Sequence, residues 1–261
     1  MSESAIDKIR GLMVPVITPR QGDTLDTVSL GNLLRFLIEN GVDGVFVLGT
    51  TGEFQHMSLT DKQQVIKTAV DAVAGQVPVL VGISAQTVAE TEKLIKLCNQ
   101  SAMDAVVLAP MFGEGQTEAK ISLAEELSDR PILLYNNPAI HGQKHLDLEL
   151  VKKVTGHPKI IGIKDSSGDP EYFEKLLGLK SEKFLVFQGR EKFILDSMAK
   201  GAAGFVSGTA NVYPKEFKTL LLKKDPKILE EILKLKKDLN LLAPDYISAL
   251  KEKLRELDKI E

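Results

Sequence analysis

The segment Ile160-Ile161-Gly162-Ile163-Lys164 is apolar from its first residue up to the lysine on which it ends. A strand with one wet face alternates apolar and polar residues, whereas a parallel strand covered on both faces is an unbroken apolar run. We therefore expect a buried parallel strand here. Seven further segments have the same pattern: 12–18, 44–48, 77–83, 105–109, 132–135, 184–187 and 204–207.

The segments between these runs have the period of helices. Val28 to Glu39, for example, places its leucines at spacings of three and four, which predicts an amphipathic helix. Thr60 with Gln63 predicts a capping box at the start of the next helix. Eight such βα units predict an α/β fold, a (β/α)8 or TIM barrel. A doubly wound open sheet is the alternative, but no G-x-G-x-x-G follows any predicted strand.

We expect a single domain over residues 1–261, because no Pro/Gly/Ser-rich linker divides the 261-residue chain. The barrel would occupy residues 11–224. From Asp225-Pro226 onward only helical patterns remain, so residues 225–261 are predicted to form a C-terminal helical extension of about two helices.

Composition excludes several classes of protein. A net charge of −3 argues against nucleic acid or an anionic membrane as partner. The single cysteine, Cys98, excludes an internal disulfide and a thiolate zinc cluster, and the spacing of the four histidines supports no metal site. No signal peptide and no apolar run long enough to span a bilayer is visible, so we expect a cytoplasmic protein.

In a (β/α)8 barrel the active site lies at the carboxyl ends of the strands, where Lys164 is the sharpest signal. Desolvation disfavours the charged form of an amine, and a neutral amine can attack a ketone to form a Schiff base. The alternative is a lysine that merely extends to the surface from a strand end.

Two other strand ends carry candidate groups. Gly49-Thr50-Thr51-Gly52 offers backbone N–H groups and two hydroxyls that could hold a carboxylate, although an ordinary glycine-containing turn has the same composition. Tyr135 ends another run, and its phenol could carry a proton or simply fill space with its hydroxyl in water.

Taken in order, these strand ends resemble one family. Gly49-Thr50-Thr51-Gly52-Glu53, Tyr135-Asn136-Asn137-Pro138, the run ending in Lys164 and the segment 204–211 resemble the dihydrodipicolinate synthase / N-acetylneuraminate lyase superfamily of class I pyruvate aldolases. The resemblance spans roughly residues 11–220 and implies a barrel that works without a cofactor, usually as a homotetramer. Because the C-terminal region is shorter than in many relatives, a dimer is also considered.

The resemblance also implies roles for residues. Lys164 would form an imine with pyruvate or another 2-oxo acid. Thr50 and Thr51, in the turn that begins at Gly49, would bind its carboxylate. Tyr135 would relay a proton between the imine, the substrate hydroxyl and Thr51. The backbone near Val206 would line the pocket.

Departures from the family pattern concern the second substrate, a small aldehyde. Dihydrodipicolinate synthases typically have an arginine two residues after the YN-x-P proline, where this chain has Ile140, followed by His141. A relay tyrosine that acts across a subunit interface is replaced by Phe112. The segment 186–189, which ends on Gly189, resembles archaeal 2-keto-3-deoxygluconate aldolases.

Three hypotheses follow. The favoured one is a Schiff-base lyase that cleaves or forms a 2-oxo-3-deoxy sugar acid. The second is a dihydrodipicolinate synthase that condenses pyruvate with aspartate semialdehyde, in which His141 replaces the missing arginine contact. The third is a barrel that binds a 2-oxo acid without turnover, suggested by the incomplete relay at Phe112.

Overall fold

The computed structural model describes residues 5–113, 116–140, 142–241 and 245–261. Its contacts group the chain into two compact units. One comprises Met1–Arg10 and Leu80–Val206, and the other comprises Gly11–Val79 and Ser207–Glu261.

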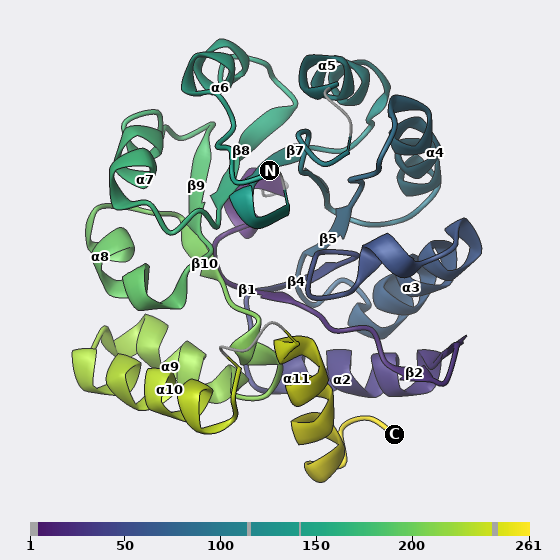
Figure 1. Cartoon of the computed structure of the whole chain (residues 1–261), viewed down its shortest axis with the longest axis vertical. Helices are drawn as coiled ribbons and strands as arrows, with labels where there is room; N and C mark the ends of the chain where they lie inside the picture. Colours follow the sequence, from purple (N-terminus) through teal and green to yellow (C-terminus); the bar gives the residue numbers. More distant parts are fainter. Residues whose placement is uncertain (1–4, 114–115, 141, 242–244) are drawn as a thin grey trace. The chain divides into compact units, whose positions relative to one another are not determined.

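The first unit consists of parallel strands with a helix after each of them up to β9. Its strands are β5 (Val79–Gly82, whose first residue falls in the second unit), β6 (Ala105–Leu108), β7 (Ile132–Asn136), β8 (Ile160–Asp165), β9 (Leu185–Gln188) and β10 (Gly204–Val206). Its helices are α1 (Ala5–Lys8), α4 (Val88–Asn99), α5 (Thr117–Leu127), α6 (Leu148–Val154), α7 (Pro170–Leu177) and α8 (Ile194–Ala199), with 3-10 turns η2 (Pro138–Ile140) and η3 (Glu191–Phe193). Figure 1 shows α4 to α8 along the outer side of these strands.

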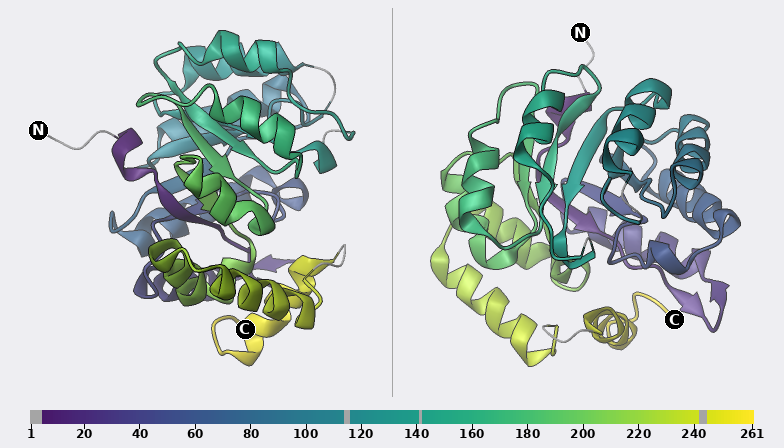
Figure 2. Two further views of the ribbon diagram at one scale, coloured as in Figure 1. Left: turned by 90° about the vertical axis from the view of Figure 1, so that its left-hand side faces the viewer. Right: turned by 45° about the horizontal axis from the view of Figure 1, so that its top comes forward.

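The second unit consists of the two segments Gly11–Val79 and Ser207–Glu261. Its strands are β1 (Gly11–Pro15), β2 (Arg20–Gln21), β3 (Thr24–Leu25) and β4 (Gly44–Val47). Its helices are α2 (Thr27–Glu39), α3 (Leu59–Val73), α9 (Pro214–Lys223), α10 (Pro226–Asp238) and α11 (Tyr246–Glu256), with 3-10 turns η1 (Phe54–His56) and η4 (Thr209–Asn211). Helices α9 and α10 pack side by side (Figure 2).

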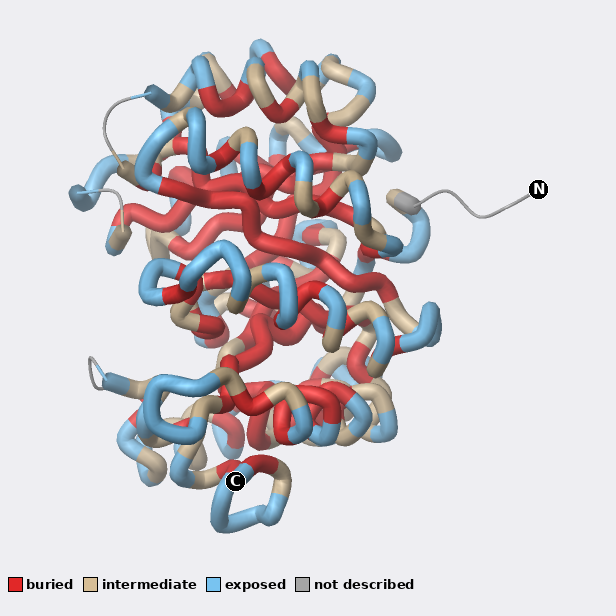
Figure 3. The backbone as a smooth tube through the Cα atoms, turned by 90° about the vertical axis from the view of Figure 1, so that its right-hand side faces the viewer, coloured by how far each residue is buried: buried red, intermediate tan, exposed pale blue. Residues whose placement is uncertain are grey.

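Eight strands close into a parallel barrel in the order β1-β10-β9-β8-β7-β6-β5-β4, so the predicted (β/α)8 fold is confirmed and the open sheet is not. Every apolar run of the sequence overlaps one of these strands, although β1, β7, β8 and β9 each extend one residue beyond the predicted bounds. Strands β4 to β10 are buried at all of their residues, which is why they lack an alternating pattern. Figure 3 shows the strands as buried tubes and the outer turns of the helices as exposed.

Helix ends follow capping chemistry, with one correction to the sequence prediction. The Asp225 side chain accepts a hydrogen bond from the Lys227 N–H at the start of α10, and Pro226 occupies the first turn, as expected. The capping box predicted at Thr60 is wrong. Helix α3 is capped by Ser58, whose hydroxyl accepts from the Asp61 N–H at 3.0 Å, and Thr60 lies inside the helix.

One short pair of strands was absent from the sequence prediction. Strands β2 and β3 form a short antiparallel hairpin around Gly22, which has a φ of 58°. Cys98 is fully buried, and burial raises the pKa of its thiol to about 12, so its side chain packs as a small apolar group. Among the described residues, no helix is long and apolar enough to cross a membrane, and no three His, Cys, Asp or Glu residues gather as a metal site would need.

Lys120 is the largest fully buried side chain in the described part of the chain. It lies in the first turns of α5, and its ammonium donates hydrogen bonds to the carbonyls of Ala85 at 2.8 Å, Gln86 at 3.1 Å and Phe112. Burial lowers the pKa of this ammonium. One buried side chain thereby ties the segment after β5 to the segment after β6.

We expect Lys120→Met to lower the free energy of unfolding by about 3 kcal/mol, because it leaves three carbonyls without their buried donor. Urea unfolding measures this loss. The control is Lys96→Met, which removes an exposed ion pair with Glu92 and should cost less than about 0.5 kcal/mol. Equal losses in the two variants would contradict the assignment.

Candidate active site

Lys164 and Tyr135 occupy facing positions on the adjacent strands β8 and β7. Each is only 5% exposed, and the Lys164 Nζ lies 4.0 Å from the centroid of the Tyr135 ring. Facing residues of neighbouring strands project from the same face of a sheet, so the Lys164 amine and the Tyr135 phenol lie in the same local environment. The structure thus brings together two of the three groups that the sequence singled out for chemistry.

The Tyr135 hydroxyl has a partner that the sequence analysis did not assign. The Asn137 side-chain amide donates to this hydroxyl at 2.8 Å, and Asn137 is itself buried. An accepted hydrogen bond on the phenol oxygen helps to fix its position. The sequence signal that could have predicted this contact is the polar side chain of Asn137, two residues after Tyr135.

Asp165 follows Lys164, and its carboxylate is held on the other face of β8. It accepts from the Asn136 amide at 2.6 Å and from the Ser167 hydroxyl at 2.8 Å. Burial raises the pKa of the Asp165 carboxyl, and these hydrogen bonds oppose the rise. The side chain therefore anchors the end of β8 to β7 and to the following turn.

Glycine is required where the chain turns after β9. The Gly189 N–H donates to the Asp165 carbonyl at 2.7 Å. A Cβ at this position would lie 2.0 Å from the Ser166 hydroxyl oxygen, so a larger residue cannot take its place without displacing Ser166. Gly189 keeps the segment after β9 in contact with the segment that follows Lys164.

The remaining candidates of the first unit lie at strand ends or just beyond them. Val206, the last residue of β10, is buried, and Phe112 is buried after β6 with its carbonyl bound by Lys120. Ile140 is half-buried in η2, where its N–H donates to the Asn137 carbonyl at 3.0 Å. His141 lies outside the described residues.

In the second unit, Gly49 to Glu53 form a tight turn after β4. The hydrogen bonds that close the turn are donated by the Gly52 and Glu53 N–H groups, so they do not use those of Thr50 and Thr51. A Cβ on Gly49 would lie 2.7 Å from the Phe46 ring. The Thr50 hydroxyl oxygen is buried and has no hydrogen-bond partner among the described residues. An unsatisfied buried hydroxyl is costly, and a bound ligand is one way to satisfy it.

Thr51 is buried beside a residue from the far end of the sequence. Its hydroxyl lies 3.1 Å from the hydroxyl of Tyr246, the first residue of α11. Lys251 of the same helix pairs with Glu53, the last residue of the turn. The local sequence pattern of α11 does not predict these contacts.

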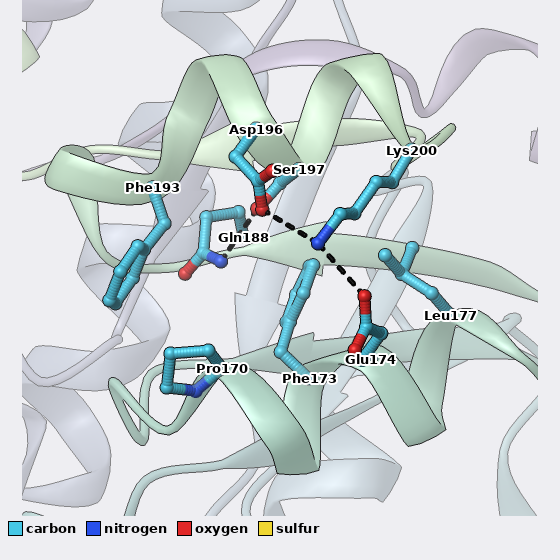
Figure 4. Close-up of a pocket in the computed structure, with 9 residues that line it drawn as sticks. All are labelled: Pro170, Phe173, Glu174, Leu177, Gln188, Phe193, Asp196, Ser197 and Lys200. Atoms are coloured by element: carbon cyan, nitrogen blue, oxygen red, sulfur yellow. Dashed lines mark hydrogen bonds and ion pairs between the residues drawn. The ribbon is translucent and has the colours of Figure 1, made fainter.

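A separate hollow lies between α7 and α8, on the helix side of β9 (Figure 4). It measures about 260 Å³, open solvent included. Gln188 in its wall donates to the Ser197 hydroxyl at 2.9 Å, and Lys200 bridges Glu174 and Asp196 at its rim. Gln188 pairs in register with Asp165, not with Lys164, so the hollow is on the opposite face of the strands from the Lys164 amine.

Comparison with known proteins shows the family of this chain. The model of the dihydrodipicolinate synthetase family matches residues 8–256. The 4-hydroxy-tetrahydrodipicolinate synthase of Thermus thermophilus is 35% identical over 217 residues, which cover 79% of this chain and 71% of that protein.

Solved structures agree. Dihydrodipicolinate synthase from Acinetobacter baumannii, chloride-inhibited and complexed with pyruvate, has a TM-score of 0.86 at 27% identity, covering 97% of this chain and 90% of that one. N-acetylneuraminate lyase from Mycoplasma synoviae has a TM-score of 0.83 at 25% identity, covering 97% and 88%. The chain therefore belongs to the dihydrodipicolinate synthetase family and is an enzyme of the class I, pyruvate-dependent lyase type.

Proposed function

We propose that this enzyme is a Schiff-base aldolase that cleaves or forms a 2-oxo-3-deoxy sugar acid, with pyruvate as one of the two products or substrates. The observation that carries the proposal is the buried Lys164 amine at the end of β8, 4.0 Å from the ring of the buried Tyr135. A primary amine at this place can serve as the nucleophile that forms a Schiff base with a ketone.

The chemistry proposed for Lys164 needs no group beyond the substrate and the side chains. The neutral amine adds to the 2-oxo carbon of pyruvate to give a carbinolamine. The hydroxyl of the carbinolamine takes up a proton and leaves as water, which yields a protonated imine. This imine withdraws electrons, so C3 can lose a proton to form an enamine that attacks an aldehyde. The reverse sequence breaks the same C–C bond. Tyr135, fixed by Asn137, carries the protons at these steps.

Carboxylate binding is assigned to the turn after β4. Gly49 gives the turn its shape, and Thr50 and Thr51 contribute backbone N–H groups and hydroxyls. The partnerless, buried Thr50 hydroxyl supports this role, since a carboxylate oxygen would accept its hydrogen bond. The backbone at Val206 and Gly189 is assigned to the wall of the pocket.

A neutral, hydroxylated aldehyde is proposed because the usual carboxylate contact is missing. Ile140 has no donor to replace a guanidinium, and Phe112 has no proton to give.

The second candidate is 4-hydroxy-tetrahydrodipicolinate synthase, the name carried by the relatives. It needs a cation for the carboxylate of aspartate semialdehyde. One observation favours it: the exposed Arg190 follows β9 and donates from its Nε to the Ser166 carbonyl at 2.7 Å, which leaves a guanidinium beside the segment after Lys164. His141 is the other candidate for this contact. An assembly of two or four chains stays a prediction.

We expect Lys164→Ala to lower kcat by at least about 1,000-fold, because the variant has no amine to form the imine. Pyruvate release from 2-oxo-3-deoxygluconate, coupled to lactate dehydrogenase, measures this. Lys153→Ala, which removes an exposed amine on α6, should leave kcat unchanged. If the folded, unaltered enzyme neither releases pyruvate from the sugar acid nor condenses pyruvate with aspartate semialdehyde, the binding-only hypothesis takes the place of this one.

The choice of aldehyde is tested with Ile140→Arg. We expect unaltered enzyme to have a kcat/KM for the sugar acid at least about tenfold above that for pyruvate with aspartate semialdehyde. The arginine should raise kcat/KM for the semialdehyde about tenfold, since a bidentate contact to a carboxylate adds more than 1 kcal/mol.

Ile140→Leu is the matched control and should change neither substrate's kcat/KM. A wild-type preference for aspartate semialdehyde, with no pyruvate released from any sugar acid, would establish the synthase in place of the aldolase.

A further inference from the structure

The C-terminal helix α11 reaches the turn that carries Thr51. The two hydroxyl oxygens, Thr51 Oγ1 and Tyr246 Oη, lie 3.1 Å apart, and either can be the donor. Thr51 is 6% exposed, whereas Tyr246 is half-buried. Gly208 lies beside the pair, since a Cβ there would make ordinary contacts at 3.6 Å from the Thr51 hydroxyl and 3.7 Å from the Tyr246 ring.

Helix α11 is also held at other points, so the Tyr246 hydroxyl is not needed as its tether. Lys251 pairs with Glu53, and Leu250 and Leu254 are fully buried. Beyond the helix, the Glu261 N–H donates to the Ser29 hydroxyl at 3.0 Å, and Figure 1 shows α11 near α2, which carries Ser29. With these anchors in place, the position of Tyr246 is fixed even without its hydroxyl.

A hydroxyl–hydroxyl hydrogen bond has a property that an ion pair lacks. Each oxygen can donate and accept at once, so the direction of the bond can reverse without moving a heavy atom. The Thr51–Tyr246 pair therefore links a buried hydroxyl to a half-exposed one by a bond through which a proton can pass.

We propose that Tyr246 is a positioning residue that completes a proton relay through Thr51 during the aldol reaction. The proposal rests on the proposed function, in which Thr51 takes part in proton transfer. When Thr51 gives up its hydroxyl proton, its oxygen takes the Tyr246 proton, and Tyr246 takes one from solvent. One O–H bond breaks and one forms at each oxygen, so the relay moves a single proton and returns to its starting state.

With Tyr246 in this role, the chain has a phenol to replace the one that is missing at Phe112. The resemblance implies a relay tyrosine after the fourth strand of the barrel, where this chain has a phenylalanine. Tyr246 supplies a phenol to the turn after β4 from a segment 195 residues along the same chain. The relay then needs no phenol from a neighbouring subunit.

We expect Tyr246→Phe to lower kcat about tenfold or more, the scale of a lost proton-transfer group, with the KM for pyruvate changed by less than about threefold. The solvent deuterium isotope effect on kcat should rise, because proton transfer becomes rate-limiting. A purely structural role would instead appear in KM and in the melting temperature.

Tyr213→Phe is the matched control, since it removes a half-buried phenol of the same unit, at the start of α9, and should leave both quantities unchanged. Borohydride trapping of pyruvate on Lys164 is measured alongside and should be the same in Tyr246→Phe as in the unaltered enzyme. If the unaltered enzyme traps pyruvate and turns over but Tyr246→Phe matches it in kcat and isotope effect, the relay is wrong and the proposed function stands. If the unaltered enzyme traps no pyruvate, the proposed function fails first.

Discussion

Lys164 and Tyr135 lie opposite each other because of an irregularity in β8. The pairing of β7 with β8 runs from Ile132 opposite Ile160 to Leu133 opposite Gly162, so β8 holds one extra residue at this point. A bulge of this kind reverses which face the later residues of the strand present. Without it, Lys164 would project from the face that now holds Asp165, among the groups that anchor the strand end, and not beside the phenol.

Gly162 is what permits this bulge against β9. A Cβ there would lie 2.2 Å from the Leu185 carbonyl oxygen, a distance that no side chain tolerates. Among the four residues that precede Lys164 in the segment 160–164, Gly162 is the one that lacks an aliphatic side chain. A close backbone approach, a register shift and the orientation of the amine therefore follow from one missing Cβ.

Sequence patterns predicted the repeated elements of the fold and the features that depend only on residues close together in the sequence. The eight strands could be found because burial on both faces makes each an apolar run, and the Asp225-Pro226 helix start because capping is local chemistry. Thr60 was wrong because Ser58, two residues earlier, caps the helix with an equally suitable hydroxyl. Lys120 was missed because a lysine is taken as exposed, although it shares the buried face of α5 with Ile121 and Ala124. Tyr246 had no signal at all, since its partner is distant in sequence.

The central claim is that the Lys164 amine forms an imine with a 2-oxo acid. It is tested most directly by incubating the protein with pyruvate and sodium borohydride, then digesting it and mapping the mass change. We predict a reduced pyruvate adduct on the Lys164 peptide and on no other peptide, with none in Lys164→Ala. A folded protein that gains no adduct, or gains it on another lysine, would contradict the account.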